Sequence, residues 1–241
     1  HILIEAMKLS FADRAKYIAD MDHVEVPLDG LLSKEYARGR QGEIDPIKAL
    51  DHAAGVPLGA SDTIYLTTAD KDGNMCSFIN SLFHHFGSGV TAGDTGIMLQ
   101  SRGVGFSLEA DHRNCIAPGK RPFHTIIPGF VMRDGEPWMS YGIMGGDMQP
   151  QGHVQVLSNM VDFGMNIQEA IEAPRFRVLG GLDVAIEYGV PDEVFDELRS
   201  RGHDVARGGG YEGFGGGQGI VRLPEGVYMA GSDQRRDGCA V

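Results

Sequence analysis

The chain has 241 residues, a formal net charge of −12 and 42% apolar residues. This length is enough to bury the core of one or two domains, and the composition is that of an ordinary globular protein. The acidic balance, with no basic patch, argues against nucleic acid and anionic membranes as partners. No run approaches the ~18 apolar residues that a membrane span needs. We therefore expect no nucleic-acid partner and no membrane partner.

Metal and disulfide chemistry find little support in the sequence. Cys76, Cys115 and Cys239 lack the spacing of metal ligands and cannot all pair, so no disulfide framework is expected. The adjacent His84 and His85 lack the helical zinc motif in which a glutamate and a second histidine follow the first. The sequence therefore predicts no metal site.

The first predicted element is an amphipathic helix over residues 1–19, because apolar residues recur there at helical spacing. Residues 20–62 contain several prolines and glycines, which is typical of a loop-rich connector, with a short helix near 33–39. The chain starts with His1, inside a helical pattern, so we expect a further part of the protein upstream. The compartment stays open, with the cytoplasm favoured.

From Thr63 onwards the apolar pattern changes to a period of two, which predicts strands. Asp-Gly turns separate two pairs of such runs, as in β-hairpins. The predicted strands are residues 63–69, 75–82, 96–100, 127–133 and 137–143.

Helices and a final strand pair are predicted in the rest of the chain from apolar spacing and from proline and glycine at element ends. They are a helix with Val154, Leu157, Met160 and Val161 on one face, helices over 168–173 and 192–201, and strand, turn and strand over 217–231. Strand pairs followed by helices indicate a layered α+β domain.

Thr63 opens the first predicted strand and is the main candidate for a catalytic residue. A threonine becomes strongly nucleophilic without a histidine partner when it is a chain N-terminus, because its own α-amino group then takes the hydroxyl proton. Thr63 is internal, so this role requires cleavage of the Asp62–Thr63 bond. The alternative is an ordinary strand threonine.

Five segments, in order, resemble the small subunit of the gamma-glutamyltransferase family. Residues 1–62 resemble the end of that family's large subunit, notably at Ile4-Glu5-Ala6-Met7 and Phe11-Ala12-Asp13-Arg14. The five segments are Thr63 to Asn74, Gly119-Lys120-Arg121-Pro122, Gly142-Ile143-Met144-Gly145-Gly146, Ala173-Pro174-Arg175-Phe176 and Gly231-Ser232-Asp233-Gln234-Arg235.

The resemblance implies a fold and a mode of action. The fold is the four-layer αββα sandwich of N-terminal-nucleophile hydrolases, made as a zymogen that cleaves itself before Thr63. Residues 1–62 would end the large subunit and residues 63–241 would form the small, catalytic subunit. The missing N-terminal portion is then a partner, a homo-oligomer is compatible, and no metal or organic cofactor is required.

Further site residues follow from the resemblance. Gly145 and Gly146 match the family's oxyanion hole, where small residues let backbone N–H groups approach a developing oxyanion; the alternative is a simple turn. Ser81 matches a hydroxyl residue that hydrogen-bonds the nucleophile, or is a polar residue on a half-buried strand. His124 and Thr125 match a serine pair that holds the substrate's α-carboxylate.

Three positions depart from the family pattern. Where the family binds the α-amino group of a glutamyl substrate, this chain has Phe83, Arg102 and Gly105. An ammonium needs acceptors, and an arginine beside it would repel it. Arg102 suits an acyl group that ends in a carboxylate, such as glutaryl, unless it points into solvent or forms a structural pair.

This pattern resembles the gamma-glutamyltransferase-like subfamily that includes glutaryl-cephalosporin acylases. The chain is therefore expected to cleave a small-molecule amide through an acyl-enzyme. One alternative is a true gamma-glutamyltransferase that hydrolyses glutathione, and another is a catalytically silent assembly subunit. Asp233, Arg235 and Arg236 match the family's closing motif, and core ion pairing is the role expected for them.

Overall fold

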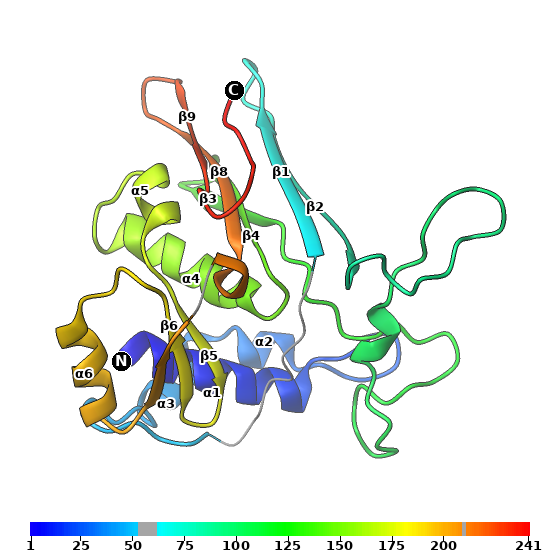
Figure 1. The fold of residues 1–241 in the computed structure, drawn as a ribbon, viewed down its shortest axis with the longest axis horizontal. Coiled ribbons are helices and arrows are strands. Elements are labelled where there is room, and N and C mark those ends of the chain that lie inside the picture. The colour runs from blue at the N-terminus through cyan, green and yellow to red at the C-terminus, as the bar shows by residue number, and fades with distance from the viewer. Residues whose placement is uncertain (53–61, 209–210) are drawn as a thin grey trace. The chain divides into compact units, whose positions relative to one another are not determined.

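The computed structural model describes residues 1–52, 62–208 and 211–241, which fall into two compact units (Figure 1). Unit 1 comprises the described parts of residues 1–58, 101–124 and 176–207, and unit 2 those of 59–100, 125–175 and 208–241. The part of the predicted connector at residues 53–61 lies outside the description. Within the described ranges, no helix has both the length and the apolar character needed to cross a bilayer.

Unit 1 combines helices with a three-stranded sheet of order β5-β6-β7. Strands β5 and β6 are antiparallel, whereas β6 and β7 are parallel and are joined through α6. The elements are α1 (Ile2–Tyr17), α2 (Leu28–Leu31), α3 (Lys34–Gln41), the 3-10 helix η1 (Arg102–Gly105), β5 (Phe176–Gly180), β6 (Asp183–Ile186), α6 (Asp192–Ser200) and β7 (Asp204–Arg207).

The core of unit 1 forms between α1 and the sheet. Ile4, Met7 and Phe11 are buried at helical spacing on α1. They share one cluster with residues of the three strands and α6, namely Val178, Val184, Ile186, Leu198 and Val205. The predicted helices over 1–19, 33–39 and 192–201 are confirmed as α1, α3 and α6.

Unit 2 contains a four-stranded sheet of order β3-β4-β8-β9 and a separate hairpin, β1–β2. All neighbouring strands in both are antiparallel. The elements are β1 (Asp62–Ala69), β2 (Met75–Phe83), β3 (Gly129–Arg133), β4 (Glu136–Met144), α4 (Met148–Val161), α5 (Ile167–Glu172), the 3-10 helix η2 (Tyr211–Phe214), β8 (Gly216–Arg222) and β9 (Tyr228–Ser232).

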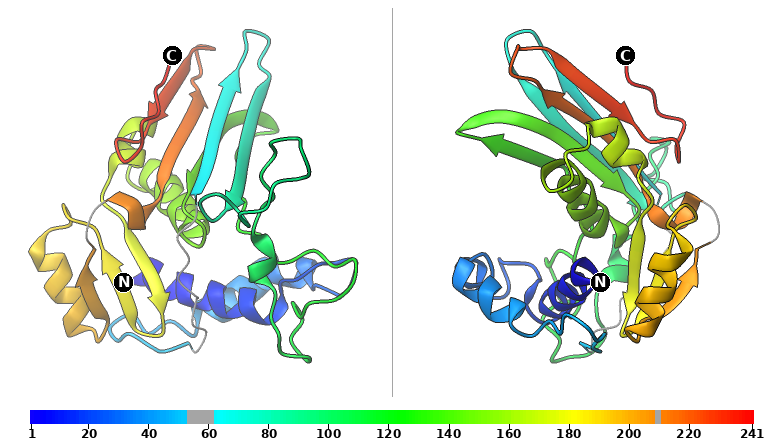
Figure 2. Two further views of the ribbon diagram at one scale, coloured as in Figure 1. Left: turned by 45° about the vertical axis from the view of Figure 1, so that its right-hand side comes forward. Right: turned by 90° about the vertical axis from the view of Figure 1, so that its left-hand side faces the viewer.

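The four-stranded sheet has α4 and α5 on one face and the hairpin on the other (Figure 2). Ile143 of β4 packs against Gly152 of α4, where an added Cβ would lie 2.6 Å from its side chain. The neighbouring Gly142 points to the opposite face, where the ring of Tyr65 covers it, as the period of two in a strand requires. The mixed helix and sheet content is therefore confirmed. The described residues of unit 2 form three layers, and the complete four-layer sandwich stays a prediction.

Most predicted strands are present, but the strand at 96–100 is wrong. That segment belongs to a loop that closes on itself, with Leu99 N–H donating to the Val90 carbonyl (2.8 Å) and Ala92 N–H to the Ile97 carbonyl (2.9 Å). A single isolated bridge joins Thr91 and Met98. The apolar run was real, but its backbone partners are local instead of belonging to a sheet.

The predicted apolar face of α4 is only partly correct. Leu157 and Met160 do pack against the core, but Val154 and Val161 are 42% and 60% exposed. Val156 is fully buried in their place. The first half of α4 is buried around much of its circumference, so the apolar stripe that is typical of a surface helix does not describe it.

Candidate active site

Thr63 lies at an irregularity in the β1–β2 ladder. Asp62 pairs with Phe83, and the next pair is Ile64 with Asn80. Two residues of β2, Ser81 and Leu82, therefore lie opposite Thr63 alone, which is the arrangement of a β-bulge. A bulge re-aims the side chains beside it, and the Thr63 side chain here is buried, with 8% of the residue exposed.

The hydroxyl groups on the two sides of this bulge are hydrogen-bonded. Thr63 Oγ1 donates to Ser81 Oγ at 3.2 Å, and Ser81 Oγ accepts the Phe83 N–H at 2.9 Å. Phe83 holds a left-handed backbone (φ 78°), and its ring lies against that of His84, with centroids 4.5 Å apart. The arrangement fixes the direction of the Thr63 hydroxyl. The catalytic roles of both hydroxyls stay predictions.

Gly145 and Gly146 connect the end of β4 to the start of α4. Both have positive φ, 114° and 58°, and a Cβ on Gly145 would lie 3.0 Å from Gly215 Cα. Their carbonyls accept the N–H groups of Met148 and Gln149 at 3.0 Å each. Their own N–H groups donate to no other described residue. Two backbone donors at the positive end of a 14-residue helix favour a negative charge.

The packing of β1 on β4 bears on where Thr63 lies relative to this glycine pair. The Tyr65 ring covers Gly142, and Thr67 Oγ1 lies 2.6 Å from Ser140 Oγ. A step from Tyr65 to Thr67 along β1 therefore matches a step from Gly142 back to Ser140 along β4. We infer that two residues back from Tyr65, at Thr63, the strand lies level with Met144 and so beside the glycine pair.

Tyr65 was not singled out from the sequence, although it lies two positions after Thr63 on the same strand face. It is buried, its hydroxyl is 2.7 Å from Ser77 Oγ, and burial raises its pKa. The sequence carries no signal for this contact, because Tyr65 and Gly142 lie on strands of two different sheets that only the fold brings together.

The remaining predicted substrate residues are divided between the two units. Phe83 and the buried Thr125 belong to unit 2, whereas Arg102 and His124 belong to unit 1. The alternative that Arg102 points into solvent is wrong, because the residue is 3% exposed and burial lowers the pKa of its guanidinium. His124 is exposed, with Nδ1 2.7 Å from the Pro122 carbonyl. Substrate binding by these residues stays a prediction.

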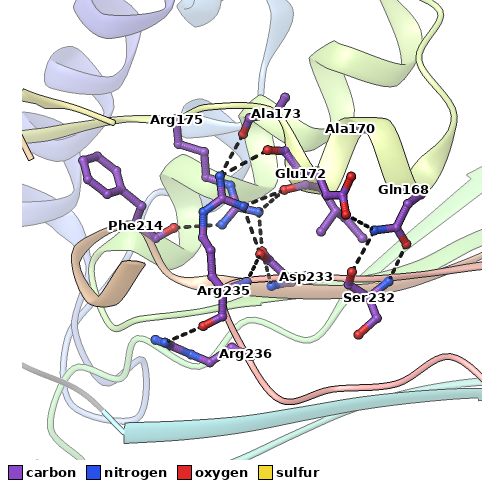
Figure 3. Close-up of polar contacts among 12 residues, drawn as sticks. Gln168, Ala170, Glu172, Ala173, Arg175, Phe214, Ser232, Asp233, Arg235 and Arg236 are labelled. Atoms are coloured by element: carbon purple, nitrogen blue, oxygen red, sulfur yellow. Dashed lines mark hydrogen bonds and ion pairs between the residues drawn. The ribbon is translucent and has the colours of Figure 1, made fainter. Parts of the chain in front are cut away.

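The closing motif forms a buried ion cluster (Figure 3). The Asp233 carboxylate pairs with Arg175 at 2.8 Å and with Arg235 at 2.9 Å. The expected core ion pairing is therefore confirmed for Asp233 and Arg235, with Arg175 as the partner that the sequence did not reveal. Arg236 instead donates to the Arg235 carbonyl at 3.0 Å. Arg175 also holds the Phe214 carbonyl at 2.8 Å, next to the Gly215 that supports Gly145.

One group among the described residues has side chains of the kind that bind metal ions: His1, Glu5 and His203 in unit 1. His1 Nδ1 and His203 Nε2 are 2.8 Å apart, which is a hydrogen bond. The Lys8 ammonium contacts both Glu5 (2.8 Å) and His203 (3.3 Å) and so occupies the place of a cation. The group is a buried hydrogen-bond network.

Comparison with known proteins defines the class to which this site belongs. The chain matches the gamma-glutamyltranspeptidase family over residues 1–241. It therefore belongs to that family.

Three relatives illustrate the range of the similarity. The glutathione hydrolase-like YwrD proenzyme of Bacillus subtilis (strain 168) is 42% identical over 249 residues, covering 100% of this chain and 46% of that protein. The cephalosporin acylase structure from Bacillus halodurans has 46% identity and a TM-score of 0.92, covering 98% of this chain and 43% of that one. A gamma-glutamyltranspeptidase chain from Pseudomonas nitroreducens has 28% identity and a TM-score of 0.66, covering 73% of this chain and 97% of that one. The chain thus spans less than half the length of the first two relatives.

Proposed function

We propose that the protein is a self-cleaving amide hydrolase whose nucleophile is Thr63. The observation that carries the proposal is the Thr63–Ser81 hydrogen bond at the bulge, on a strand that packs against β4, the strand that leads into Gly145 and Gly146. It combines an oriented hydroxyl with backbone donors that can stabilise an oxyanion. A purely structural strand threonine would need neither an oriented hydroxyl nor backbone donors of this kind.

The first step would convert the precursor. Thr63 Oγ1 attacks the carbonyl carbon of Asp62, and the acyl group moves from the Thr63 nitrogen to its oxygen. Water then hydrolyses the ester, which leaves a carboxylate on Asp62 and a free α-amino group on Thr63. Residues 1–62 would end the large subunit, and residues 63–241 would form the small one.

Two comparisons support this division of the chain. The word proenzyme in the name of the Bacillus subtilis relative describes a precursor. Residues 63–241 are 179 of the 241 residues, a share close to the 73% that matches almost the whole Pseudomonas nitroreducens chain. This chain covers 46% of the Bacillus subtilis relative, and the remaining portion of such a precursor would be the partner of this chain; the four-layer sandwich is the fold that we propose for the two together.

The second step would act on the substrate. The Thr63 amine takes the hydroxyl proton, and Oγ1 attacks the amide carbonyl of the substrate. The N–H groups of Gly145 and Gly146 stabilise the oxyanion, and the amine of the substrate leaves with the proton. Water, or an amine acceptor, then resolves the acyl-enzyme. The residues present need no metal or organic cofactor for this chemistry.

For the substrate we propose an acyl amide that ends in a carboxylate, such as a glutaryl amide. Phe83, Arg102 and Gly105 offer no side-chain acceptor for an ammonium, and Arg102 offers a cation. The similarity to a cephalosporin acylase supports an acyl amide as the substrate. The name of the Bacillus subtilis relative supports the second candidate, a glutathione hydrolase. A silent assembly subunit has no specific observation in its favour.

The test is the mass of the full-length protein and of two variants. We expect the wild type to contain a new chain that begins with Thr63, and Thr63→Ala to remain one uncut, inactive chain. Thr63→Ser should still cut, because it keeps the hydroxyl. If Thr63→Ala is cut at the same bond, another protease is responsible and the assignment of the nucleophile fails.

A further inference from the structure

Gln149 is a fully buried polar residue that the proposed mechanism does not use. It lies in the first turn of α4, three residues after Gly146, and has 0% of its surface exposed. Its Nε2 group has no hydrogen-bond partner among the described residues. A buried donor without a partner destabilises a fold. An apolar residue of similar size would avoid that cost but would leave the Ile127 N–H without the oxygen that accepts its hydrogen bond, so we look for the role of Gln149 in this contact.

The hydrogen bonds of Gln149 join two parts of the candidate site. Its backbone N–H donates to the Gly146 carbonyl at 3.0 Å, and its side-chain Oε1 accepts the Ile127 N–H at 2.9 Å. Ile127 lies two residues after the buried Thr125 and before β3 begins. One residue thus links the glycine pair to the segment that carries Thr125.

A second contact holds the same segment one helical turn later. An added Cβ on Gly129 would lie 3.0 Å from the ring of His153, and His153 Nδ1 is 2.6 Å from the Gln149 carbonyl. The segment 125–129 therefore lies against α4 at two points, and Gln149 makes the polar contact nearer to the glycine pair. The place of this segment relative to the glycine pair is therefore set by buried side chains of α4.

We propose that Gln149 is a positioning residue that sets the acyl length which the enzyme accepts. The inference rests on the proposed function. An acyl group that ends in a carboxylate has two anionic points, the developing oxyanion and the terminal carboxylate. Gly145 and Gly146 would bind the first, and Thr125, together with the proposed Arg102, would bind the second. The Gln149–Ile127 hydrogen bond fixes their separation, and only an acyl chain of matching length reaches both.

The experiment compares succinyl, glutaryl and adipyl amides of one amine with the processed full-length enzyme. The wild type should prefer one length in kcat/KM. In Gln149→Met, which has a similar volume but no acceptor, we expect the preference over the neighbouring lengths to fall about tenfold, the effect of losing one such hydrogen bond. Gln155→Met is the matched control, since Gln155 is also buried on α4 and donates to the Gln151 carbonyl of the same helix. It should keep the wild-type preference.

Equal slowing of all three amides in Gln149→Met would show a merely structural role and overturn the inference. If that variant does not fold, Gln149→Glu decides, because it keeps an oxygen in place for the Ile127 N–H. It should keep the wild-type order of lengths, and a folded Gln149→Glu with a changed order would overturn the inference. A wild type that cleaves all three equally would overturn it too. A wild type that cleaves no acyl amide would instead overturn the proposed function, and the inference with it.

Discussion

Replacing Asp233 with asparagine tests the buried ion cluster. The Asp233 carboxylate is fully buried and accepts four hydrogen bonds, from Arg175, from Gly217 N–H and from both the side chain and the backbone of Arg235. Asparagine has almost the same shape but no charge. The two guanidinium groups, each with 2% of the side chain exposed, would then lack their counter-ion.

The expected loss is large on the scale of a domain's stability. Removing one partner from a buried ion pair costs about 3–5 kcal/mol, against a total of about 5–15 kcal/mol for a folded domain. The carbonyls of Ile171, Glu172 and Ala173 at the end of α5 would still accept from the arginines. We therefore place the loss near the lower value, about 3 kcal/mol.

The assay is urea unfolding of the full-length protein, with hydrogen exchange measured on peptides from β8 and β9, which carry Gly217 and precede Asp233. The control is Asp192→Asn, because Asp192 pairs with Arg207 but its side chain is 93% exposed. Such a pair contributes about 0–1 kcal/mol. If Asp233→Asn lowers the free energy of unfolding no more than Asp192→Asn does, the cluster does not stabilise the fold as described.

Three further predictions follow. Burial lowers the pKa of His153 and His203 to about 4. Between pH 6.5 and 4 the unfolded state therefore binds more protons than the folded state. The free energy of unfolding should fall by up to about 3 kcal/mol per histidine as the pH is lowered through this range. His203→Gln should flatten this slope in urea titrations at several pH values, and an unchanged slope would contradict the pKa of His203. Gly146→Val should lower kcat by ~10²–10³, whereas a folded variant at full rate would remove Gly146 from the site. Glutaryl amides should exceed γ-glutamyl amides in kcat/KM, and Arg102→Gln should narrow the gap; the reverse preference would favour glutathione hydrolysis.

The extent of sequence-based prediction varies with the element. The hairpin β1–β2 was predictable because alternating residues and the turn around Gly73 act locally. Strands β5, β6 and β7 were missed because each has only four or five residues and charged residues at or near the ends, such as Arg177 and Asp183. Their Val178, Val184 and Val205 become recognisable as core only once α1 packs on them.

The candidate site shows the same limit. The roles predicted for Thr63 and Gly145 come from the resemblance of their segments to the family, and their positions on β1 and after β4 agree with the strands predicted from the sequence. The pairing of Asp233 with Arg175 was not predictable, because the two residues are 58 apart in the chain and only the fold brings them together. Likewise the sequence shows that Arg102 is charged, but its burial could not be predicted because it depends on how the folded chain packs.

The bulge at Thr63 has a consequence for the integrity of the fold after cleavage. Among the described residues, one pair, Asp62 with Phe83, lies beyond the bulge, whereas the six pairs from Ile64–Asn80 to Ala69–Met75 form an uninterrupted ladder. Breaking the Asp62–Thr63 bond would therefore separate the Asp62–Phe83 pair from this ladder and leave the six pairs of the ladder intact. The new amino terminus would then be held by the neighbouring ladder, so that the severed end stays in place instead of fraying.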